Sequence, residues 1–399
     1  MYDLLKGLKV VEGAAFIAGP SCCLQLAQMG AEVIRFDAIG GGPDFSRWPL
    51  ASNGASYYWD GLNKGKRSIA IALERPEGRA LAQRLAASGD GLFVTNYPVD
   101  GFLAYEKLVA LRPDLICLRV MGWADGRPAV DYTINAAAGV PSMTGHSDDS
   151  RPVNHVLPAW DLITGAYGAF ALLAAERERR ESGKGRELRL ALADVAAATL
   201  GNLGQVAEVL ASGRNRQRGG NELFGAFGRD FVIASGERLM IVAITARQWT
   251  AVVKTLGIGE AVAAIEAKAQ VSFADEGARY THRTSLYALV ETAVRDRSLS
   301  ELAPAFDAGG VCWSRYQGLA EAVATDAQLF TANPVFSSVS HAGTGRYLTP
   351  GAAVRIPADK RGEPARAPRI GEHTDWALAE LLGMSDSEIG RLHDARIVA

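Results

Sequence analysis

Asp161 is the residue whose position in the sequence most clearly suggests chemistry. It follows an apolar run and precedes residues 166–175, a stretch of small and apolar side chains that predicts a buried helix. An aspartate is rarely buried unless a partner pairs with it or a reaction uses it. Two interpretations are open at this point. Asp161 could cap the helix, or it could be a nucleophile whose charge the helix dipole stabilises.

Two other segments carry groups that could bind an anion or stabilise negative charge. Gly225, Ala226, Phe227 and Gly228 could present backbone N–H groups to a developing oxyanion, or they could form a hairpin-like loop. The basic segment 63–68 could contact nucleotide phosphates, or it could be a solvated turn. Three glycines at 40–42 lack the G-x-G-x-x-G spacing, so a nicotinamide site is not favoured.

Composition and charge exclude several classes of function. The chain has 399 residues and a formal net charge of −2, with no basic excess to bind nucleic acid or a membrane surface. No apolar run is long enough to span a membrane. The six histidines and four cysteines show no metal-ligand spacing, so we expect no metal site. The sparse, unpatterned cysteines favour a reducing, cytoplasmic location.

An alternation of strands and helices must position these side chains. The pattern predicts strands at 8–12, 32–37, 68–73, 91–96 and 115–120, with helices at 19–29, 76–88 and 105–111. Such alternation is typical of an α/β fold with a parallel sheet, whose ligands bind beyond the carboxyl ends of the strands. We therefore expect one rim formed by residues 14–20, 37–42, 96–98 and 122–132.

The rest of the chain predicts a second, smaller domain. Residues 162–210 look helical, with a break near 183–185, and the glycine- and proline-rich stretch 342–369 looks like an extended connector before two final helices. We place the N-terminal part of a large domain at 1–210, a linker at 211–224, a small α+β domain at 225–330, and a connector that returns to the large domain at 331–399.

Several motifs in a fixed order resemble those of the class III CoA-transferases. They are GLKVVE (7–12), AGP (18–20), LAQMGAEVIR (26–35), NKGKRSI (63–69), VTNY (94–97), WDLITG (160–165) and GEHT (371–374). The resemblance runs from about residue 6 to the last residue. It implies a large Rossmann-like domain with a parallel sheet built from both chain ends, a smaller domain, and an interlocked homodimer.

A second set of motifs resembles a subgroup of this family. It comprises RFDAIGGG (35–42), VDYT (130–133), VNHVLPAWD (153–161), GAFGRDF (225–231) and RLHD (391–394). The likeness implies that the chain moves CoA within one molecule, between the C1 and C4 carboxyls of mesaconate. CoA is then part of the acyl-CoA substrate, and no separate cofactor is expected.

The resemblance also assigns site residues. Asp161 would attack the thioester, giving an aspartyl anhydride and then an aspartyl-CoA thioester, and as an ordinary aspartate it would already be ionised at neutral pH. The oxyanion and acyl pocket would comprise Gly225, Ala226, Phe227, Gly228, Ile17 and Tyr132. CoA would contact Phe16, Ala18, Asn63, Lys66, Arg67, Asn96 and Tyr97.

Some positions depart from the wider family. Val130 stands where racemases of the family carry a histidine, and Ile17 stands where formyl and oxalyl transferases carry a glutamine. Ala38 and Ala104 replace arginines of those transferases, which argues against formate or oxalate as substrate. The alternatives that stay open are an intermolecular transferase between a dicarboxyl-CoA and a free acid, a 2-methylacyl-CoA racemase, and a CoA-binding protein without catalytic activity.

Overall fold

The computed structural model describes residues 1–399, which divide into two compact units. The large unit contains Met1–Ala138, His155–Ser212 and Asn333–Ala399. The small unit contains Gly139–Asn154 and Gly213–Ala332, so residues 139–154, which we expected in the large domain, belong to the small unit. Both ends of the chain lie in the large unit.

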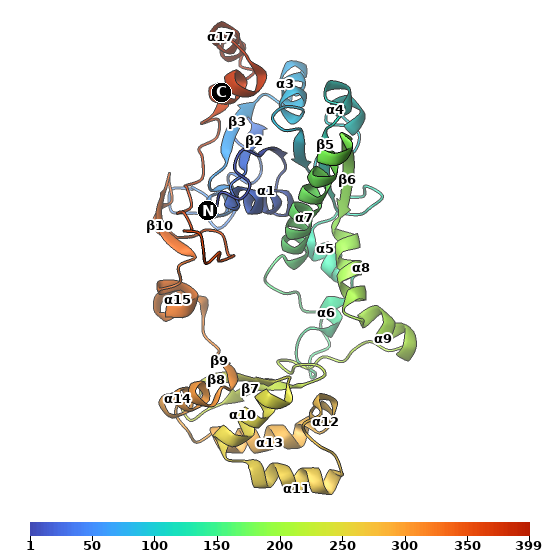
Figure 1. Ribbon diagram of the computed structural model, residues 1–399, viewed down its shortest axis with the longest axis vertical. Helices are drawn as coiled ribbons and strands as arrows, with labels where there is room; N and C mark the ends of the chain where they lie inside the picture. Colours follow the sequence, from blue (N-terminus) through green and yellow to red (C-terminus); the bar gives the residue numbers. More distant parts are fainter. The chain divides into compact units, whose positions relative to one another are not determined.

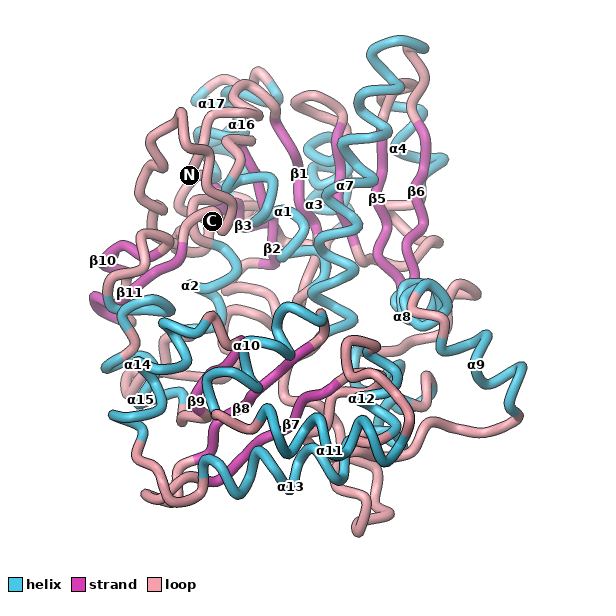
Figure 2. Tube along the Cα trace, turned by 60° about the horizontal axis from the view of Figure 1, so that its bottom comes forward, coloured by secondary structure: helices cyan, strands magenta, loops and turns pink.

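A six-stranded, all-parallel sheet forms the centre of the large unit, in the order β3-β2-β1-β4-β5-β6 (Figures 1 and 2). Its strands are β1 (Lys9–Gly13), β2 (Glu32–Ala38), β3 (Arg67–Ile71), β4 (Leu92–Thr95), β5 (Ile116–Met121) and β6 (Arg186–Ala191). The predicted α/β class is confirmed. All six strands come from the first half of the chain, and the C-terminal end adds only the isolated bridge between Ile71 and Val398 beside β3.

Strand β6 is absent from the sequence prediction, which made residues 162–210 helical on either side of a break. It is an edge strand, paired only with β5, and its sequence alternates charged residues with Leu188 and Leu190. These two leucines pack on the apolar core, while the arginines remain partly exposed. The alternation that marks a half-buried strand is present but spans only these two leucines, so it was not recognised between two helical segments.

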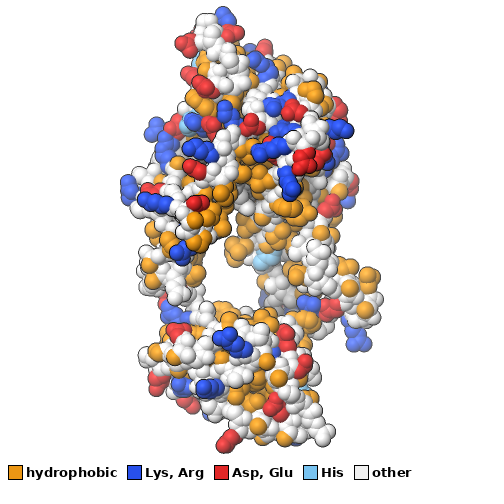
Figure 3. Space-filling model, viewed as in Figure 1, with side chains coloured by type: hydrophobic (Ala, Val, Ile, Leu, Met, Phe, Trp, Pro, Cys, Tyr) orange, Lys and Arg blue, Asp and Glu red, His pale blue; other side chains and the backbone are white.

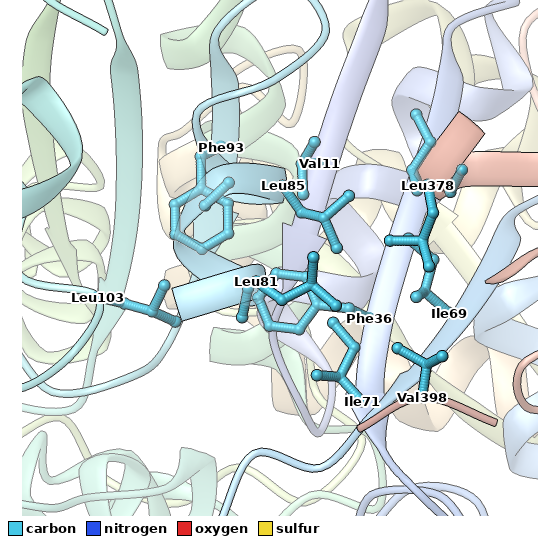
Figure 4. Close-up of a cluster of buried hydrophobic side chains, with 14 of the residues drawn as sticks. Val11, Phe36, Ile69, Ile71, Leu81, Leu85, Phe93, Leu103, Leu378 and Val398 are labelled. Atoms are coloured by element: carbon cyan, nitrogen blue, oxygen red, sulfur yellow. The ribbon is translucent and has the colours of Figure 1, made fainter. Parts of the chain in front are cut away.

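Helices cover both faces of the sheet because successive strand residues point to opposite sides. Val11, Ile34 and Phe93 pack against α3 and the C-terminal helices, and Figure 4 shows part of this cluster. Their neighbours Val10 and Val33 pack on the opposite side, against α1 and α7. The helices of the large unit are α1 (Ala18–Gln28), α2 (Tyr57–Asn63), α3 (Pro76–Ala86), α4 (Tyr105–Leu111), α5 (Asp131–Ala137), α7 (Ala159–Ser182), α8 (Leu192–Asn202), α9 (Gln205–Ser212), α16 (Thr374–Leu382) and α17 (Asp386–Asp394).

Close packing of α1 on α7 fixes the start of α7. A side chain at Gly165 would place its Cβ 2.8 Å from the Ser21 hydroxyl oxygen, and one at Gly168 would lie 3.0 Å from a Leu118 methyl group. A larger residue at Gly165 would force Ser21 or the Ala18 carbonyl to shift, and one at Gly168 would press on Leu118. The small residues after Asp161 therefore let α7 lie directly on α1 and the sheet.

The connector predicted at 342–369 is partly a β-hairpin. Strands β10 (Phe336–His341) and β11 (Gly345–Pro350) pair in antiparallel fashion. The hairpin contacts α2, because Thr344 and Tyr347 donate hydrogen bonds to the buried carboxylate of Asp60. The prediction of an extended connector was wrong here because the glycines and prolines of this region suggested irregular structure throughout.

The small unit is an antiparallel three-stranded sheet covered by helices. Its strands, in the order β7-β8-β9, are β7 (Phe227–Val232), β8 (Arg238–Ala243) and β9 (Cys312–Arg315). Its helices are α6 (Val140–Met143), α10 (Ala246–Leu256), α11 (Gly259–Ala269), α12 (Glu276–Thr281), α13 (Arg283–Val294), α14 (Leu299–Gly309), α15 (Leu319–Thr325) and the π-helical turn η1 (Ala327–Thr331). Aromatic side chains, among them Phe227, Phe231 and Tyr287, fill its core.

Across both units, every helix is too short or too polar to cross a membrane.

A buried network of charges lies among β1, β2 and β3. The guanidinium of Arg35 donates to Asp37 at 2.7 and 2.8 Å, to Glu12 at 3.1 Å and to Asp44 at 3.1 Å. The Lys66 ammonium forms an ion pair with the other oxygen of Glu12 at 2.7 Å and donates to the Pro20 carbonyl. Each charge in this group is out of contact with water, so each depends on its partners.

Lys66 tests this network. Replacing Lys66 by Met should lower the free energy of unfolding by about 3 kcal/mol or more, because Glu12 would keep a buried charge with one partner removed. Lys64→Met is the control. Lys64 is also buried, but its ammonium contacts only the Gly61 carbonyl, so the loss should be much smaller. Thermal unfolding midpoints report the loss of stability in each variant. Equal losses of stability in the two variants would contradict the assigned role of the ion pair between Lys66 and Glu12.

Candidate active site

A cavity of about 590 Å³ opens at the carboxyl ends of the strands of the large unit. The loop after β1, the segment after β4, the loop after β5 and the start of α7 line it. Three of the four segments expected at this rim are therefore present, and residues 37–42 are the exception. Asp161 lies in the cavity wall with Phe16, Val130 and Tyr97.

Asp161 does not cap α7, so the capping interpretation is wrong. The helix begins at Ala159, which makes Asp161 its third residue. The carboxylate of Asp131, on α5, takes the capping role by accepting hydrogen bonds from the backbone N–H of Trp160 at 2.6 Å and of Asp161 at 3.1 Å. Asn135, one turn further along α5, accepts from the Trp160 indole at 3.1 Å. The side-chain carboxylate of Asp161 is left without a hydrogen bond.

The surroundings of Asp161 change its acidity. Burial, followed by the nearby charge of Asp131, raises the pKa of Asp161 to about 7, and the positive charge of Arg47 partly opposes this rise. The expectation of an aspartate fully ionised at neutral pH is therefore wrong. A carboxylate with a raised pKa is a stronger base and a better nucleophile once ionised, and it ionises only as the pH passes about 7.

The loop between β1 and α1 is held from two sides. The side-chain amide of Asn96 accepts from the Ala15 N–H at 3.1 Å and donates to the Ala15 carbonyl at 3.0 Å. The Phe16 N–H donates to Asp44 at 2.7 Å, and Phe16 has a φ of 70°, a conformation that bulky residues rarely adopt. Asp44 belongs to the buried Arg35 network, so that network fixes the cavity wall at Phe16.

The structure separates the residues expected to bind CoA into two groups. Phe16, Ala18, Asn96 and Tyr97 line the cavity. Asn63, Lys66 and Arg67 do not line it; the burial of Asn63 and Lys66 argues against contact with CoA, and the role of Arg67 stays a prediction.

The reason is that their polar groups already have partners. Asn63 and Lys66 are buried in the Arg35 network. Arg67 pairs with Glu32 at 2.5 Å and lies over the Trp376 ring. The sequence showed a cluster of cations, but the acidic partners lie far away along the chain and could not be recognised.

The remaining predicted residues lie outside the cavity lining. Ile17 precedes α1, and the Tyr132 hydroxyl donates to the Val156 carbonyl at 3.2 Å. In the small unit, Phe227 and Gly228 belong to β7, and the Gly228 carbonyl accepts from Leu223 N–H at 2.8 Å and from the Tyr287 hydroxyl at 3.1 Å. The backbone N–H groups of Gly225 and Ala226 have no partner in the protein. Their role as oxyanion donors stays a prediction.

Sequence reasoning missed Asp131, Asn135, Asp44 and Arg47. Of these four, only Asp131 could have been recognised in the sequence, because it directly follows Val130, the residue that stands where racemases of the family carry a histidine. The other three lie far from Asp161 or Phe16 in the sequence, and only the fold brings them close.

No group of three His, Cys, Asp or Glu side chains in the chain is placed to hold a metal ion.

Comparison with known proteins shows the family to which this chain belongs. The family model described as CoA-transferase family III matches residues 5–374, and the chain belongs to this family. It is 47% identical to the 2-methylfumaryl-CoA isomerase of Chloroflexus aurantiacus over 100% of this chain and 98% of that protein. It is 31% identical to the succinate–glutarate CoA-transferase of Agrobacterium fabrum, over 94% of this chain and 95% of that protein. Among solved structures, a CAIB/BAIF family protein from Brucella suis matches with a TM-score of 0.76 and 28% identity, covering 94% of this chain and 98% of that chain.

Asp131→Asn tests the electrostatic role of the capping residue. Asparagine retains an oxygen that can accept from Trp160 and Asp161, but it removes the negative charge that raises the pKa of Asp161. The rise of kcat/KM for CoA-ester turnover with pH should therefore move to lower pH. Asp125→Asn is the control, because Asp125 lines the same cavity but pairs with Arg127. An unchanged profile for Asp131→Asn, or equal shifts in both variants, would contradict this role.

Proposed function

We propose that this chain is an intramolecular CoA transferase that interconverts the C1 and C4 thioesters of 2-methylfumarate, also called mesaconate. The observation that carries the proposal is the full-length likeness to 2-methylfumaryl-CoA isomerase, 47% identical with almost no unmatched sequence in either protein. The unpaired carboxylate of Asp161 in the cavity supplies the nucleophile that such a transfer needs.

In the proposed reaction Asp161 acts twice as an acyl carrier. Its carboxylate attacks the thioester carbonyl, which expels CoA as a thiolate and forms a mixed anhydride. The thiolate attacks the Asp161 carbonyl, giving an aspartyl-CoA thioester and the free dicarboxylate. The second carboxylate of the acid then attacks this thioester, which expels CoA again as a thiolate and forms a new anhydride with Asp161. Attack of the thiolate on the acid's carbonyl releases the isomeric ester and restores Asp161.

Each attack creates a tetrahedral oxyanion that needs preorganised donors. Gly225 and Ala226 are the proposed donors, supported by their two consecutive backbone N–H groups without partners. Phe16, Ala18 and Tyr97 are the proposed CoA contacts in the cavity. Ile17 and Tyr132 remain proposed acyl-pocket residues on the family resemblance alone.

The alternatives differ in what they require of the cavity. A racemase needs a base that moves a proton, and the cavity wall presents the apolar Val130 at the position compared with the racemase histidine. An intermolecular transferase needs the free acid to leave and another to enter, and the chain is 27% identical to the succinyl-CoA–D-citramalate CoA-transferase of Chloroflexus aurantiacus. This makes intermolecular transfer the second candidate function.

We further propose that the protein works as a homodimer. None of the residues of α9 is buried, although Val206, Val209 and Leu210 are apolar, and Leu210 is 81% exposed. Figure 3 shows hydrophobic side chains at the surface around α9. A second copy of the chain is the proposed partner that covers them, as the family resemblance implies.

The four cysteines are free thiols, which supports the proposal of a reducing, cytoplasmic location.

Asp161→Ala is the first test of the proposed reaction. The variant should lose about three orders of magnitude or more in kcat while its affinity for the CoA ester survives, because only the covalent step is removed. Hydroxylamine added during turnover of the unaltered enzyme should modify Asp161 and no other carboxylate. A variant that kept more than about a tenth of the rate would show that another group carries the acyl chain.

Isotope exchange separates intramolecular from intermolecular transfer. Labelled free mesaconate is added while the enzyme isomerises unlabelled 2-methylfumaryl-CoA. If the acid stays in the site, label enters the ester far more slowly than the ester isomerises. Incorporation at a rate comparable to isomerisation would favour the intermolecular transferase.

A further inference from the structure

Arg47 carries a cation without a carboxylate partner next to the candidate active site. Its guanidinium lies 5.5 Å from the centre of the Phe16 ring and 5.3 Å from that of Tyr58, and it forms no ion pair. The backbone around it is anchored, because the Ser56 hydroxyl donates to the Arg47 carbonyl at 2.5 Å. Two aromatic rings thus hold an exposed arginine head whose N–H donors are unused.

The arginines that line the cavity are already paired with other groups. Arg119 donates to three backbone carbonyls and to Glu187. Arg127 pairs with Asp125 at 2.7 Å, and Arg189 pairs with Glu187 at 2.8 Å. Arg47, which lies against the wall residue Phe16, is therefore the arginine whose guanidinium donors are free to bind an anion.

Arg47 also lies close enough to act on the nucleophile. Phe16, the ring beneath Arg47, shares the cavity wall with Asp161. The charge of Arg47 is the only one among the causes of the Asp161 pKa that lowers it. Phe16 cannot easily move, because its N–H is bound to Asp44 of the buried network. The Arg47 guanidinium, although it is not itself part of the cavity lining, is therefore held against a residue of the same wall as the nucleophile.

We propose that Arg47 binds the free carboxylate of the dicarboxyl-CoA substrate while Asp161 attacks the other end. This inference rests on the proposed function, and it adds the residue that selects a diacid. The main chain of this diacid has only four carbons, so its second carboxylate must lie near the thioester that Asp161 attacks. Arg47 would hold whichever carboxylate is not bonded to Asp161 or CoA. It would also retain the freed acid in the site until CoA returns to its other end.

The binding test compares two esters of the same shape. Tiglyl-CoA carries a methyl group where the C1 ester of 2-methylfumarate carries its free carboxylate. Both are titrated by calorimetry into Asp161→Asn protein, which cannot turn them over. Adding Arg47→Met should weaken binding of 2-methylfumaryl-CoA about tenfold or more, as expected for one charge-assisted hydrogen bond, and leave tiglyl-CoA within about twofold. Arg47→Lys should lie between the two.

Arg127→Met is the matched control, because Arg127 lines the cavity and also lies over a ring, that of Trp123, but is paired with Asp125. Its effect should be small and equal for both esters. Equal weakening of both esters by Arg47→Met, or no weakening, would overturn the assignment of Arg47 alone. Failure of the Asp161→Asn parent to bind 2-methylfumaryl-CoA at all would overturn the proposed function together with it.

A second readout uses the Arg47→Met variant with Asp161 intact. If Arg47 retains the freed acid, labelled mesaconate should enter the ester at a larger fraction of the residual isomerisation rate than in the unaltered enzyme. A purely structural role would lower both rates together. An unchanged ratio of exchange to isomerisation would therefore contradict the retention role.

Discussion

The carboxylate of Asp131 at the start of α7 is the interaction on which the site depends. A helix start has free N–H groups that attract any nearby carboxylate, and Asp161 is itself close enough to be such a group. Asp131 reaches across from α5 and accepts from Trp160 and Asp161 instead. Asp161 is thereby left without a hydrogen bond, in a half-buried position beside a like charge, and its raised pKa follows directly.

The Arg35 network provides the second constraint. It places three carboxylates and two cations out of water among the strands, and its Asp44 binds the backbone of Phe16 in an unfavourable conformation. Phe16 in turn lies beneath Arg47. A nucleophile whose charge is poorly stabilised thus shares a cavity wall with Phe16, and Phe16 carries on its ring a cation that has no carboxylate partner. A substrate with a free carboxylate would complement both, which is the physical content of the proposed diacid specificity.

The alternation of strands and helices could be predicted from the sequence, because buried parallel strands are continuous apolar runs and their carboxyl ends define a rim. Asp161 was singled out differently, by its position before an apolar helix and by the family resemblance, and its place in the cavity wall came from the structure. Strand β6 was missed because its apolar alternation is short, with Leu188 and Leu190 separated by Arg189. The role of Lys66 was misjudged for a different reason, since Glu12 neutralises it across a long separation in sequence. Charge pairing of this kind depends on the tertiary fold and leaves no local pattern.

The ionisation of Asp161 can be observed directly. Infrared difference spectra between the unaltered protein and Asp161→Asn, recorded across the acidic and neutral range, isolate the band of the protonated Asp161 carboxyl group. If Asp131 and burial control this residue as the structure indicates, the band should disappear with a midpoint near pH 7. A midpoint near the ordinary aspartate value of about 4 would show that Asp161 is stabilised as an anion in the free protein, and would contradict its role as a poised nucleophile.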